Sequence, residues 1–224
     1  MKKVAIIQAR MGSRRLPGKA MVEINSRPLI WHIVNRARQS KVDEVILATT
    51  DDPKDDILCD YMWSQGVMSY RGAALDLLSR YWDAVEKSGA DIWTQIYGDC
   101  PCIDPSLIDK TLDNIGDSYC CYTAGYPRGL NAYSFTADRL RWAKDTCVSP
   151  HEKEFHHQFM SFGGNTVVPP WDIHGFEFCV DIPDDLEYIR SAYRDLGDNF
   201  HVNELVLWAM EKAVNSQAER VRNI

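Results

Sequence analysis

A cluster of cationic residues near the start of the chain has the composition of a polyphosphate-binding loop. The apolar run Val4–Ile7 is typical of a buried strand, and a loop of small and cationic residues follows it. The loop contains Arg10, Gly12, Ser13, Arg14, Arg15, Gly18 and Lys19. Glycines let backbone N–H groups approach an anion closely, arginines bind phosphate oxygens in bidentate fashion, and lysine adds a point charge. The alternative is an ordinary loop with solvated arginines, because the spacing matches neither a Walker A loop nor the Gly-x-Gly-x-x-Gly dinucleotide motif.

Two aspartates further along the chain lie at the ends of apolar runs and have the chemistry of metal ligands. Asp99 comes shortly after Ile92–Tyr97, and Asp181 comes directly after Phe176–Val180. Mg²⁺ is usually held by one or two carboxylates together with phosphate oxygens, so these aspartates suit a site that binds a triphosphate. The alternatives are a turn residue for Asp99 and a helix N-cap for Asp181.

An alternation of strands and helices in the first half would bring these residues together. Strands are predicted at Val4–Ile7, Val42–Thr49, Val67–Tyr70 and Ile92–Ile96. The segments between and after them have helical periodicity, with starts at Arg27-Pro28, Asp52-Pro53, near Leu75 and at Asp104-Pro105. This rhythm predicts an α/β fold with a mostly parallel sheet. Ligands bind such sheets at the carboxyl ends of the strands, where the cationic loop and Asp99 would meet.

The second half is less regular and is predicted to extend the same sheet. Its predicted strands are Tyr119–Thr123, Ala132–Phe135, Thr166–Val168 and Phe176–Val180. Its predicted helices are Pro183–Leu196 and Val202–Val214. Because no linker, repeat or low-complexity tract interrupts the chain, residues 1–224 are predicted to form a single domain, which the family resemblance described below implies to be a nucleotidyltransferase domain.

The overall composition excludes several classes of protein. A formal net charge of -7 and a pI near 5.4 disfavour a nucleic-acid-binding surface. The seven cysteines are irregularly spaced and lack structural-zinc spacing. No apolar run approaches the ~18 residues of a membrane span, and no signal peptide is recognised. We therefore expect a cytoplasmic protein with reduced thiols.

Three further groups of polar residues could carry chemistry: one at the same edge, one in a turn that could bind a sugar or acid substrate, and one that could form a metal site or an acid/base pair. They are Arg71 with Arg80, the turn Tyr126–Asn131 with Arg128, and the cluster His151, His156 and His157. The respective alternatives are surface charges beside a helix turn, a structural turn, and the face of an amphipathic helix. The histidines lack zincin spacing and have no cysteine partner, which disfavours a metal site.

These residues resemble those of a known family. Ile6–Lys19 resembles the signature of sugar-acid cytidylyltransferases, which include CMP-Kdo and CMP-N-acetylneuraminate synthetases. The likeness is greatest to the spore-coat polysaccharide biosynthesis cytidylyltransferase-like branch. Shorter matches follow in the same order, at Arg71-Gly72, Gly98–Pro101, Arg128–Leu130 and Val180–Leu186. Asn131 stands where the branch commonly has aspartate, and the usual Glu-His-Val-Thr segment has no clear counterpart, so the acceptor half departs from the pattern.

The resemblance implies a nucleotide-diphospho-sugar transferase fold, a Rossmann-like three-layer α/β/α sandwich. It implies transfer of CMP from CTP to a sugar-acid hydroxyl, with Mg²⁺ as cofactor and pyrophosphate as product. The implied catalytic residues are Arg10, Lys19 and Asp99, and the implied metal ligands are Asp99 and Asp181. The implied nucleotide-binding residues are Ala9, Arg10, Gly12, Ser13, Arg14, Lys19, Arg71, Arg80 and Gly98. The implied acceptor-binding residues are Arg128, Gly129 and Asn131.

Other functions remain open at this stage. A glycosyltransferase that uses a nucleotide-sugar donor is one, although an Asp-x-Asp motif is missing after Ile92–Tyr97. A nucleotidyltransferase with another nucleotide or a phosphonate acceptor is a second, and a catalytically silent nucleotide-binding scaffold is a third. The family resemblance also predicts a homodimer, with the aromatic segment His151–Phe162 as a candidate contact.

Overall fold

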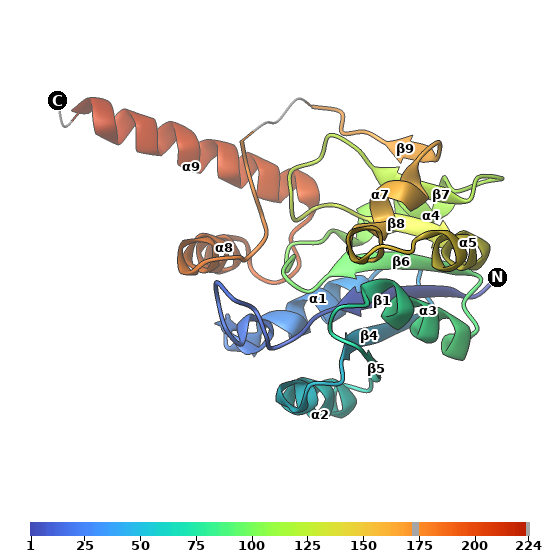
Figure 1. Ribbon diagram of the computed structural model, residues 1–224. Coiled ribbons are helices and arrows are strands. Elements are labelled where there is room, and N and C mark those ends of the chain that lie inside the picture. Colours follow the sequence, from blue (N-terminus) through green and yellow to red (C-terminus); the bar gives the residue numbers. More distant parts are fainter. Residues whose placement is uncertain (172–174, 223–224) are drawn as a thin grey trace.

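A seven-stranded sheet lies at the centre of the molecule, with the strand order β5-β4-β1-β6-β8-β7-β9 (Figure 1). The computed structural model describes the backbone of residues 1–171 and 175–222, and the side chains up to residue 215 outside that gap. The strands of the sheet are β1 (Lys3–Gln8), β4 (Glu44–Thr50), β5 (Met68–Gly72), β6 (Ile92–Tyr97), β7 (Cys120–Thr123), β8 (Tyr133–Thr136) and β9 (Asn165–Val167).

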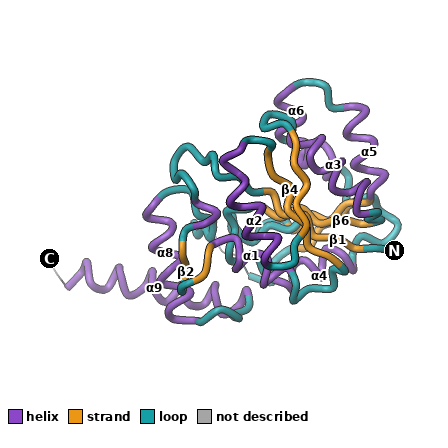
Figure 2. The backbone as a smooth tube through the Cα atoms, turned by 90° about the horizontal axis from the view of Figure 1, so that it is seen from below, coloured by secondary structure: helices purple, strands orange, loops and turns teal. Residues whose placement is uncertain are grey.

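Helices cover both faces of this sheet (Figures 1 and 2). They are α1 (Leu29–Ala37), α2 (Asp56–Ser64), α3 (Leu77–Ser88), α4 (Pro105–Asp113), α5 (Ala137–Thr146), α6 (Pro150–Glu154), α7 (His156–Ser161), α8 (Pro183–Leu196) and α9 (Val202–Arg222). Among the described residues, none of these helices combines the length and hydropathy needed to cross a membrane.

The first half of the chain forms the parallel part of the sheet. Strand β1 pairs in parallel with β4 and β6, and β4 pairs in parallel with β5. The carboxyl ends of these four strands therefore lie along one edge. Strand β8 then runs antiparallel to β6, and β7 antiparallel to β8. The prediction of a mostly parallel sheet is confirmed, with the antiparallel pairs confined to the second half.

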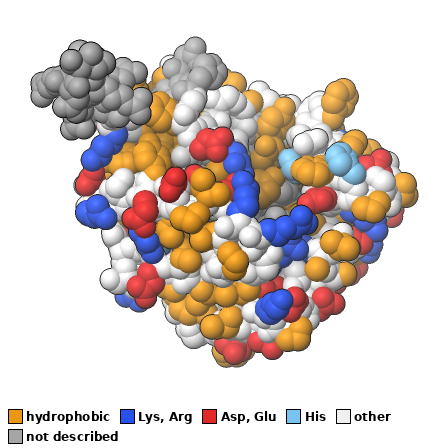
Figure 3. All heavy atoms as spheres, turned by 60° about the vertical axis from the view of Figure 1, so that its left-hand side comes forward, with side chains coloured by type: hydrophobic (Ala, Val, Ile, Leu, Met, Phe, Trp, Pro, Cys, Tyr) orange, Lys and Arg blue, Asp and Glu red, His pale blue; other side chains and the backbone are white. Residues whose placement is uncertain are grey.

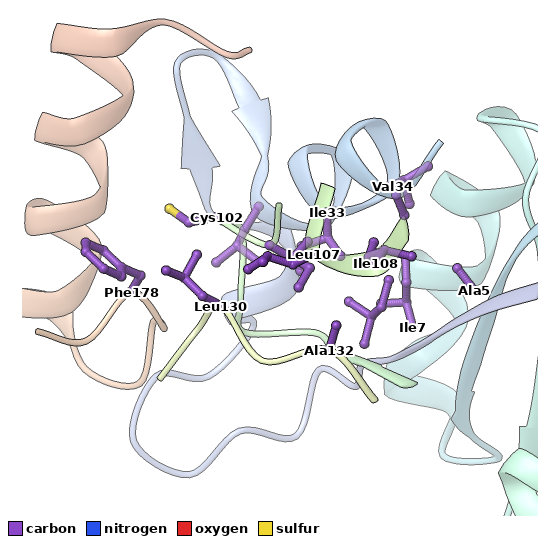
Figure 4. Close-up of a cluster of buried hydrophobic side chains, with 14 of the residues drawn as sticks. Ala5, Ile7, Ile33, Val34, Cys102, Leu107, Ile108, Leu130, Ala132 and Phe178 are labelled. Atoms are coloured by element: carbon purple, nitrogen blue, oxygen red, sulfur yellow. The ribbon is translucent and has the colours of Figure 1, made fainter. Parts of the chain in front are cut away.

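Alternating residues of β1 separate two hydrophobic cores. Ala5 and Ile7 pack with residues of α1 and α4 in one core, and Figure 4 shows this cluster. Val4 and Ile6 pack with residues of α3 and α5 in the other core. Successive side chains of a strand point to opposite faces, so a continuous apolar strand requires cover on both sides. The three-layer α/β/α architecture predicted from the resemblance is confirmed.

The segment Phe176–Val180 is not a regular strand, which corrects the prediction. It makes one isolated bridge, between Arg128 and Glu177, and one backbone hydrogen bond outside that bridge. Phe178 N donates to Arg128 O at 2.7 Å, and Val180 N donates to Asp99 O at 2.8 Å. Phe178, Cys179 and Val180 are buried and Phe176 is partly buried, but the backbone of the segment pairs only at separate points. These points still carry Asp181 to the carboxyl edge of the sheet.

One expected helix start differs, and the alternative role of Asp181 as an N-cap is not observed, although α8 begins at Pro183 as predicted. Arg27-Pro28 forms β3, which pairs with β2 (Glu23–Ile24) in a short hairpin, and α1 begins one residue later. Asp181 does not cap α8, because the oxygen that accepts from the backbone N–H groups of Asp181 and Ile182 belongs to Asp185. The Asp181 carboxylate is thereby left for contacts with other side chains.

Candidate active site

A pocket of about 570 Å³ opens at the carboxyl edge of the parallel strands, within the size range of small-molecule sites. Its lining residues include Ala9, Arg10, Ser13, Arg14, Lys19, Arg80, Gly98, Asp99 and Asp181. These nine were predicted from the sequence, and the fold brings them together from four separate segments of the chain. In Figure 3, Lys and Arg side chains gather beside a hollow with acidic side chains among them.

The cationic loop is fixed at its base by a buried aspartate. Asp55 accepts a hydrogen bond from Met11 N at 2.7 Å, and its other oxygen accepts from the backbone and hydroxyl of Thr50 and from the hydroxyl of Thr49. Burial raises the pKa of this carboxyl, but the hydrogen bonds outweigh burial and lower it below the ordinary value. Asp55 thus ties the start of the loop to the end of β4.

Gly98 is required where β6 meets β1. Its N–H donates to Gln8 O at 2.7 Å. A Cβ atom at this position would lie 2.4 Å from the same oxygen and 2.5 Å from the Ala9 side chain. Only glycine allows this close approach of β6 to β1, which holds Asp99 beside the cationic loop.

Lys19 joins the loop to both predicted metal ligands. Its Nζ lies 3.0 Å from Asp99 Oδ2, 3.0 Å from Asp181 Oδ1 and 2.9 Å from the carbonyl oxygen of Val180. The Lys19 side chain is only 14% exposed. The two carboxylates therefore share one cation, and within the described residues no group of three His, Cys, Asp or Glu side chains is placed to hold a metal ion.

Asp181 also binds two arginines through its second oxygen. Arg128 lies 2.6 Å and Arg15 lies 2.8 Å from Asp181 Oδ2. Burial alone would raise the pKa of this carboxyl, but the hydrogen bonds from Lys19 and Arg128 outweigh it and lower the pKa to about 2. Arg15, which was absent from the predicted site residues, lines the pocket beside Arg14.

Arg80 is a buried cation without a carboxylate partner among the described residues. It is 6% exposed, its Nε has no hydrogen-bond partner, and it lines the pocket. Burial lowers the pKa of this guanidinium, and the nearby charge of Arg10 acts in the same direction. A buried and uncompensated charge is costly, so this position suits a group that binds an anionic or strongly polar ligand.

One wall of the pocket comes from α6 and the start of α7. This wall contributes Pro150, Glu154, Phe155 and His157. Of these, His157 belonged to the histidine cluster considered from the sequence. Ser149 and Glu152 form a capping box that starts α6. Lys153 then binds the N-cap carboxylate of α3, Asp76, at 2.9 Å. The ion pair fixes this wall against the helix that carries Arg80.

The two adjacent histidines have different positions. His156 is fully buried beside Tyr81, and burial together with the neighbouring His157 lowers its pKa to about 3. His157 lines the pocket between Tyr97 and Tyr133, and burial lowers its pKa as well. Both imidazoles are therefore neutral at physiological pH. His156 belongs to the core, and His157 presents a neutral ring to the pocket.

Five of the predicted site residues do not line the pocket. They are Gly12, Arg71, Arg128, Gly129 and Asn131. Arg71 instead donates to the carbonyl oxygens of Thr50 and Asp52 and pairs with Asp56 at 2.6 Å. Arg128 reaches the site only through Asp181.

Gly129 has a structural reason to be glycine. It adopts a φ of +97°, and a Cβ atom there would lie 2.4 Å from the backbone of Phe178. The close approach of the turn to the Phe176–Val180 segment therefore explains why residue 129 is glycine. This explanation does not require a contact with an acceptor.

Comparison with known proteins agrees with this geometry. Residues 4–145 match the family model described as cytidylyltransferase. The spore coat polysaccharide biosynthesis protein SpsF of Bacillus subtilis is 28% identical over 214 residues, which cover 86% of this chain and 87% of that protein. The 3-deoxy-manno-octulosonate cytidylyltransferase of Aeromonas salmonicida is 32% identical over 117 residues, which cover 50% of this chain and less than half (45%) of that protein.

A solved structure has the same fold over nearly the whole chain. The cytidylyltransferase from Leptospira borgpetersenii superposes with a TM-score of 0.89 at 28% identity, and the match covers 96% of each chain. The family match includes the cationic loop and Asp99, whose side chains converge in the pocket. The chain belongs to the cytidylyltransferase family, as the resemblance of Ile6–Lys19 predicted.

Proposed function

We propose that this chain transfers CMP from CTP to a hydroxyl group of a small acidic acceptor and releases pyrophosphate. The observation that carries the proposal is the convergence of Lys19 with Asp99 and Asp181 in a pocket lined by further arginines. Displacement at the α-phosphorus requires positioning of the reactants and neutralisation of phosphate charge. The pocket has groups for both tasks.

In this proposal the cations bind the triphosphate. Arg10, Arg14 and Lys19 would contact phosphate oxygens, with Ser13 as a hydrogen-bond donor beside them. Ala9, Arg80 and Gly98 would surround the ribose and cytosine. Arg15 joins the phosphate-binding set because it lies on the same wall and already pairs with a carboxylate.

We propose Mg²⁺ as the cofactor, with Asp99 and Asp181 as its ligands. The donor set fits, because two carboxylate oxygens and the Val180 carbonyl oxygen already surround one cation, the Lys19 ammonium, within 3.0 Å. Mg²⁺ prefers oxygen ligands and usually keeps phosphate oxygens among them. When bound, the ion would neutralise charge on the α-phosphate and acidify the acceptor hydroxyl.

We propose a sugar acid as the acceptor, in the synthesis of a surface polysaccharide or glycoconjugate precursor. The names of two relatives support this class, one a 3-deoxy-manno-octulosonate cytidylyltransferase and one a spore coat polysaccharide biosynthesis protein. The wall of Tyr97, Phe155 and His157 offers aromatic rings against the apolar face of a sugar ring. Arg128, which pairs with Asp181 and is about half exposed, is the cation that we propose for an acceptor carboxylate.

The alternatives have less support. A glycosyltransferase usually needs a second carboxylate after Asp99, whereas Cys100 and Pro101 follow it here. Transfer from another nucleotide, or to a phosphonate, would use the same phosphate-binding residues and differs only in the base and acceptor pockets. A catalytically silent scaffold would not explain the paired carboxylates around Lys19.

The test is pyrophosphate release from each of CTP, ATP, GTP and UTP with Mg²⁺ and a panel of sugar acids, other small acids and a phosphonate. We expect release with CTP and a sugar acid only, and calorimetric binding of CTP in preference to UDP-sugars. Failure of turnover across the panel together with absence of CTP binding would contradict the proposal. Release with a phosphonate alone would change the acceptor class and keep the chemistry.

We also propose that the chain acts as a single domain in a cytoplasmic homodimer. The seven cysteines carry no disulfide, which suits a reducing compartment. Phe159 and Phe162, within the aromatic segment considered for the dimer contact, are 39% and 83% exposed. Light scattering of the wild type and of Phe162→Glu should show a dimer that the variant weakens, and a monomer at all concentrations of wild type would refute the assembly.

A further inference from the structure

The Lys19 ammonium is bound in the manner of a metal ion. An ammonium group has three N–H donors, and each of them meets one oxygen here, on Asp99, Asp181 and the Val180 backbone. The three distances lie between 2.9 and 3.0 Å. No donor of Lys19 is left for a phosphate oxygen while this arrangement persists.

The remaining oxygen of Asp181 is also occupied. Arg15 and Arg128 both bind Oδ2 of this carboxylate. Three cations therefore surround the two carboxylates, and the site carries its own counter-charge. Within the described part of the chain, the second oxygen of Asp99 meets only the Cys100 thiol, at 3.4 Å.

We propose that the Lys19 ammonium and the divalent cation bind alternately to the same oxygens of Asp99, Asp181 and Val180. Binding of the nucleotide drives the exchange of one cation for the other. This inference rests on the proposed function, since it assigns the partners of that site. A metal ion that arrives alone must displace the ammonium and leave it without a counter-charge in a largely buried position. A triphosphate that arrives with the ion supplies oxygens for the displaced lysine.

The exchange makes metal and nucleotide binding cooperative. Each ligand binds better when the other is present, and linkage requires that the two effects be equal in size. Two carboxylates alone are also a poor site for Mg²⁺, which normally completes its shell with phosphate oxygens and water. Lys19 would thus have two successive partners, the carboxylates before substrate binding and the phosphates after it.

The test measures Mn²⁺ binding to the purified protein without nucleotide, by calorimetry and by the electron spin resonance of the free ion. We expect wild-type protein to bind Mn²⁺ at least tenfold more weakly than the Lys19→Met variant, a coupling of the usual allosteric size. Lys153→Met removes another half-buried ammonium that pairs with an aspartate in the same region. This control variant should bind Mn²⁺ like the wild type.

A second measurement needs no variant. Wild-type protein should bind Mn²⁺ at least tenfold more tightly with saturating CTP than without it, after subtraction of the binding of Mn²⁺ to free CTP. Equal Mn²⁺ affinity of wild type and Lys19→Met, or equal affinity with and without bound CTP, would overturn the exchange.

These outcomes are separate from those of the proposed function. If Lys19→Met gains an Mn²⁺ site but wild-type protein neither binds nor turns over CTP, the proposed competition between Lys19 and the metal ion is supported and the proposed cytidylyl transfer is contradicted. If CTP turns over while Lys19→Met gains no affinity for Mn²⁺, cytidylyl transfer stands and the exchange falls. Adding Asp99→Asn to Lys19→Met should remove the gained site, which places it at this carboxylate.

Discussion

The two sides of the pocket are built by different interactions. The side that we propose for phosphate binding, the phosphate side, is a network of charges, in which Lys19, Arg15 and Arg128 converge on Asp181 within 3.0 Å. The side that we propose for acceptor binding, the acceptor side, is a wall of neutral rings, contributed by Tyr97, Phe155 and His157. Charges at strand ends can serve any triphosphate, whereas ring packing depends on the shape of one ligand.

This difference separates general chemistry from specificity. Charge-assisted hydrogen bonds to phosphate are strong and orient a common part of the substrate. A wall of rings discriminates through contact area and through the polar groups that an unsuitable acceptor leaves unpaired. We therefore expect variants on the phosphate side to change turnover or nucleotide binding, and variants on the acceptor side to change acceptor binding alone.

The largest effect is expected from Asp99→Asn. This change keeps the shape of the side chain but removes the charge that faces Lys19 at 3.0 Å. We expect kcat to fall by about 10³-fold, the order of loss when a preorganised charge-stabilising group is removed. Pyrophosphate release measures it, and Asp83→Asn, which alters a surface pair with Lys87, is the control. Retention of more than a tenth of the activity would remove Asp99 from the catalytic set.

Arg80 and Arg71 provide a paired test of where the nucleotide lies. Arg80→Met removes a buried guanidinium from the pocket, and we expect the KM for CTP to rise about 10- to 100-fold, as for loss of a charged hydrogen bond. Arg71→Met should raise it less than about threefold, because that guanidinium is held by Asp56 and two carbonyls outside the pocket. Equal effects would mean that the nucleotide extends over β5.

The cationic loop and Asp99 could be placed at the pocket from the sequence because each belongs to a local pattern. Lys19 lies in the same short loop as the arginines, and Asp99 follows a continuous apolar strand. Arg15 was left out of the predicted site residues although it lines the pocket beside Arg14, since loop residues have no periodicity that fixes the direction of their side chains. Arg71 was predicted from its place at a strand end, but the oxygens that bind it come from the β4–α2 connection.

The acceptor side could not be predicted for a physical reason. Helices α6 and α7 span five and six residues, too short for a clear periodic pattern. Their position depends on the ion pair of Lys153 with Asp76, which lies 77 residues earlier in the chain. The segment Phe176–Val180 was predicted to be a strand because its apolar residues indicate burial. A buried segment does not require a ladder of backbone hydrogen bonds, and this segment has none.

A change in the aromatic wall should have a smaller and more selective effect. Phe155→Ala removes a half-buried ring from the pocket wall, and we expect the KM for the acceptor to rise about tenfold, or roughly 1.4 kcal/mol. The KM for CTP should change by less than about twofold. Initial rates with each substrate varied in turn separate the two constants. A parallel rise in both would show that the wall also contacts the nucleotide.

The smallest predicted effect concerns the stability of the acceptor side in mild acid. His156 is buried neutral, with its pKa lowered from 6.5 to about 3 by burial and by His157. As the pH falls below 6.5, this histidine binds a proton in the unfolded chain but stays neutral in the folded chain. Its contribution to the free energy of unfolding is therefore complete above pH 6.5 and declines below it. Asp181 does not titrate in this range, because its pKa is lowered to about 2. Each pH unit can cost at most about 1.4 kcal/mol per such group.

Urea unfolding at pH 6.5 and 5.5 measures this contribution. We expect the wild type to lose about 1 kcal/mol more than His156→Phe between the two pH values, because phenylalanine fills the same space beside Tyr81 without a titrating group. His151→Gln, a change of an exposed histidine, should keep the wild-type dependence. An unchanged dependence in His156→Phe would assign the acid sensitivity to His157 or to the buried His32, whose pKa values are also lowered by burial. Bound acceptor should reduce only the contribution of His157, whose ring faces the pocket.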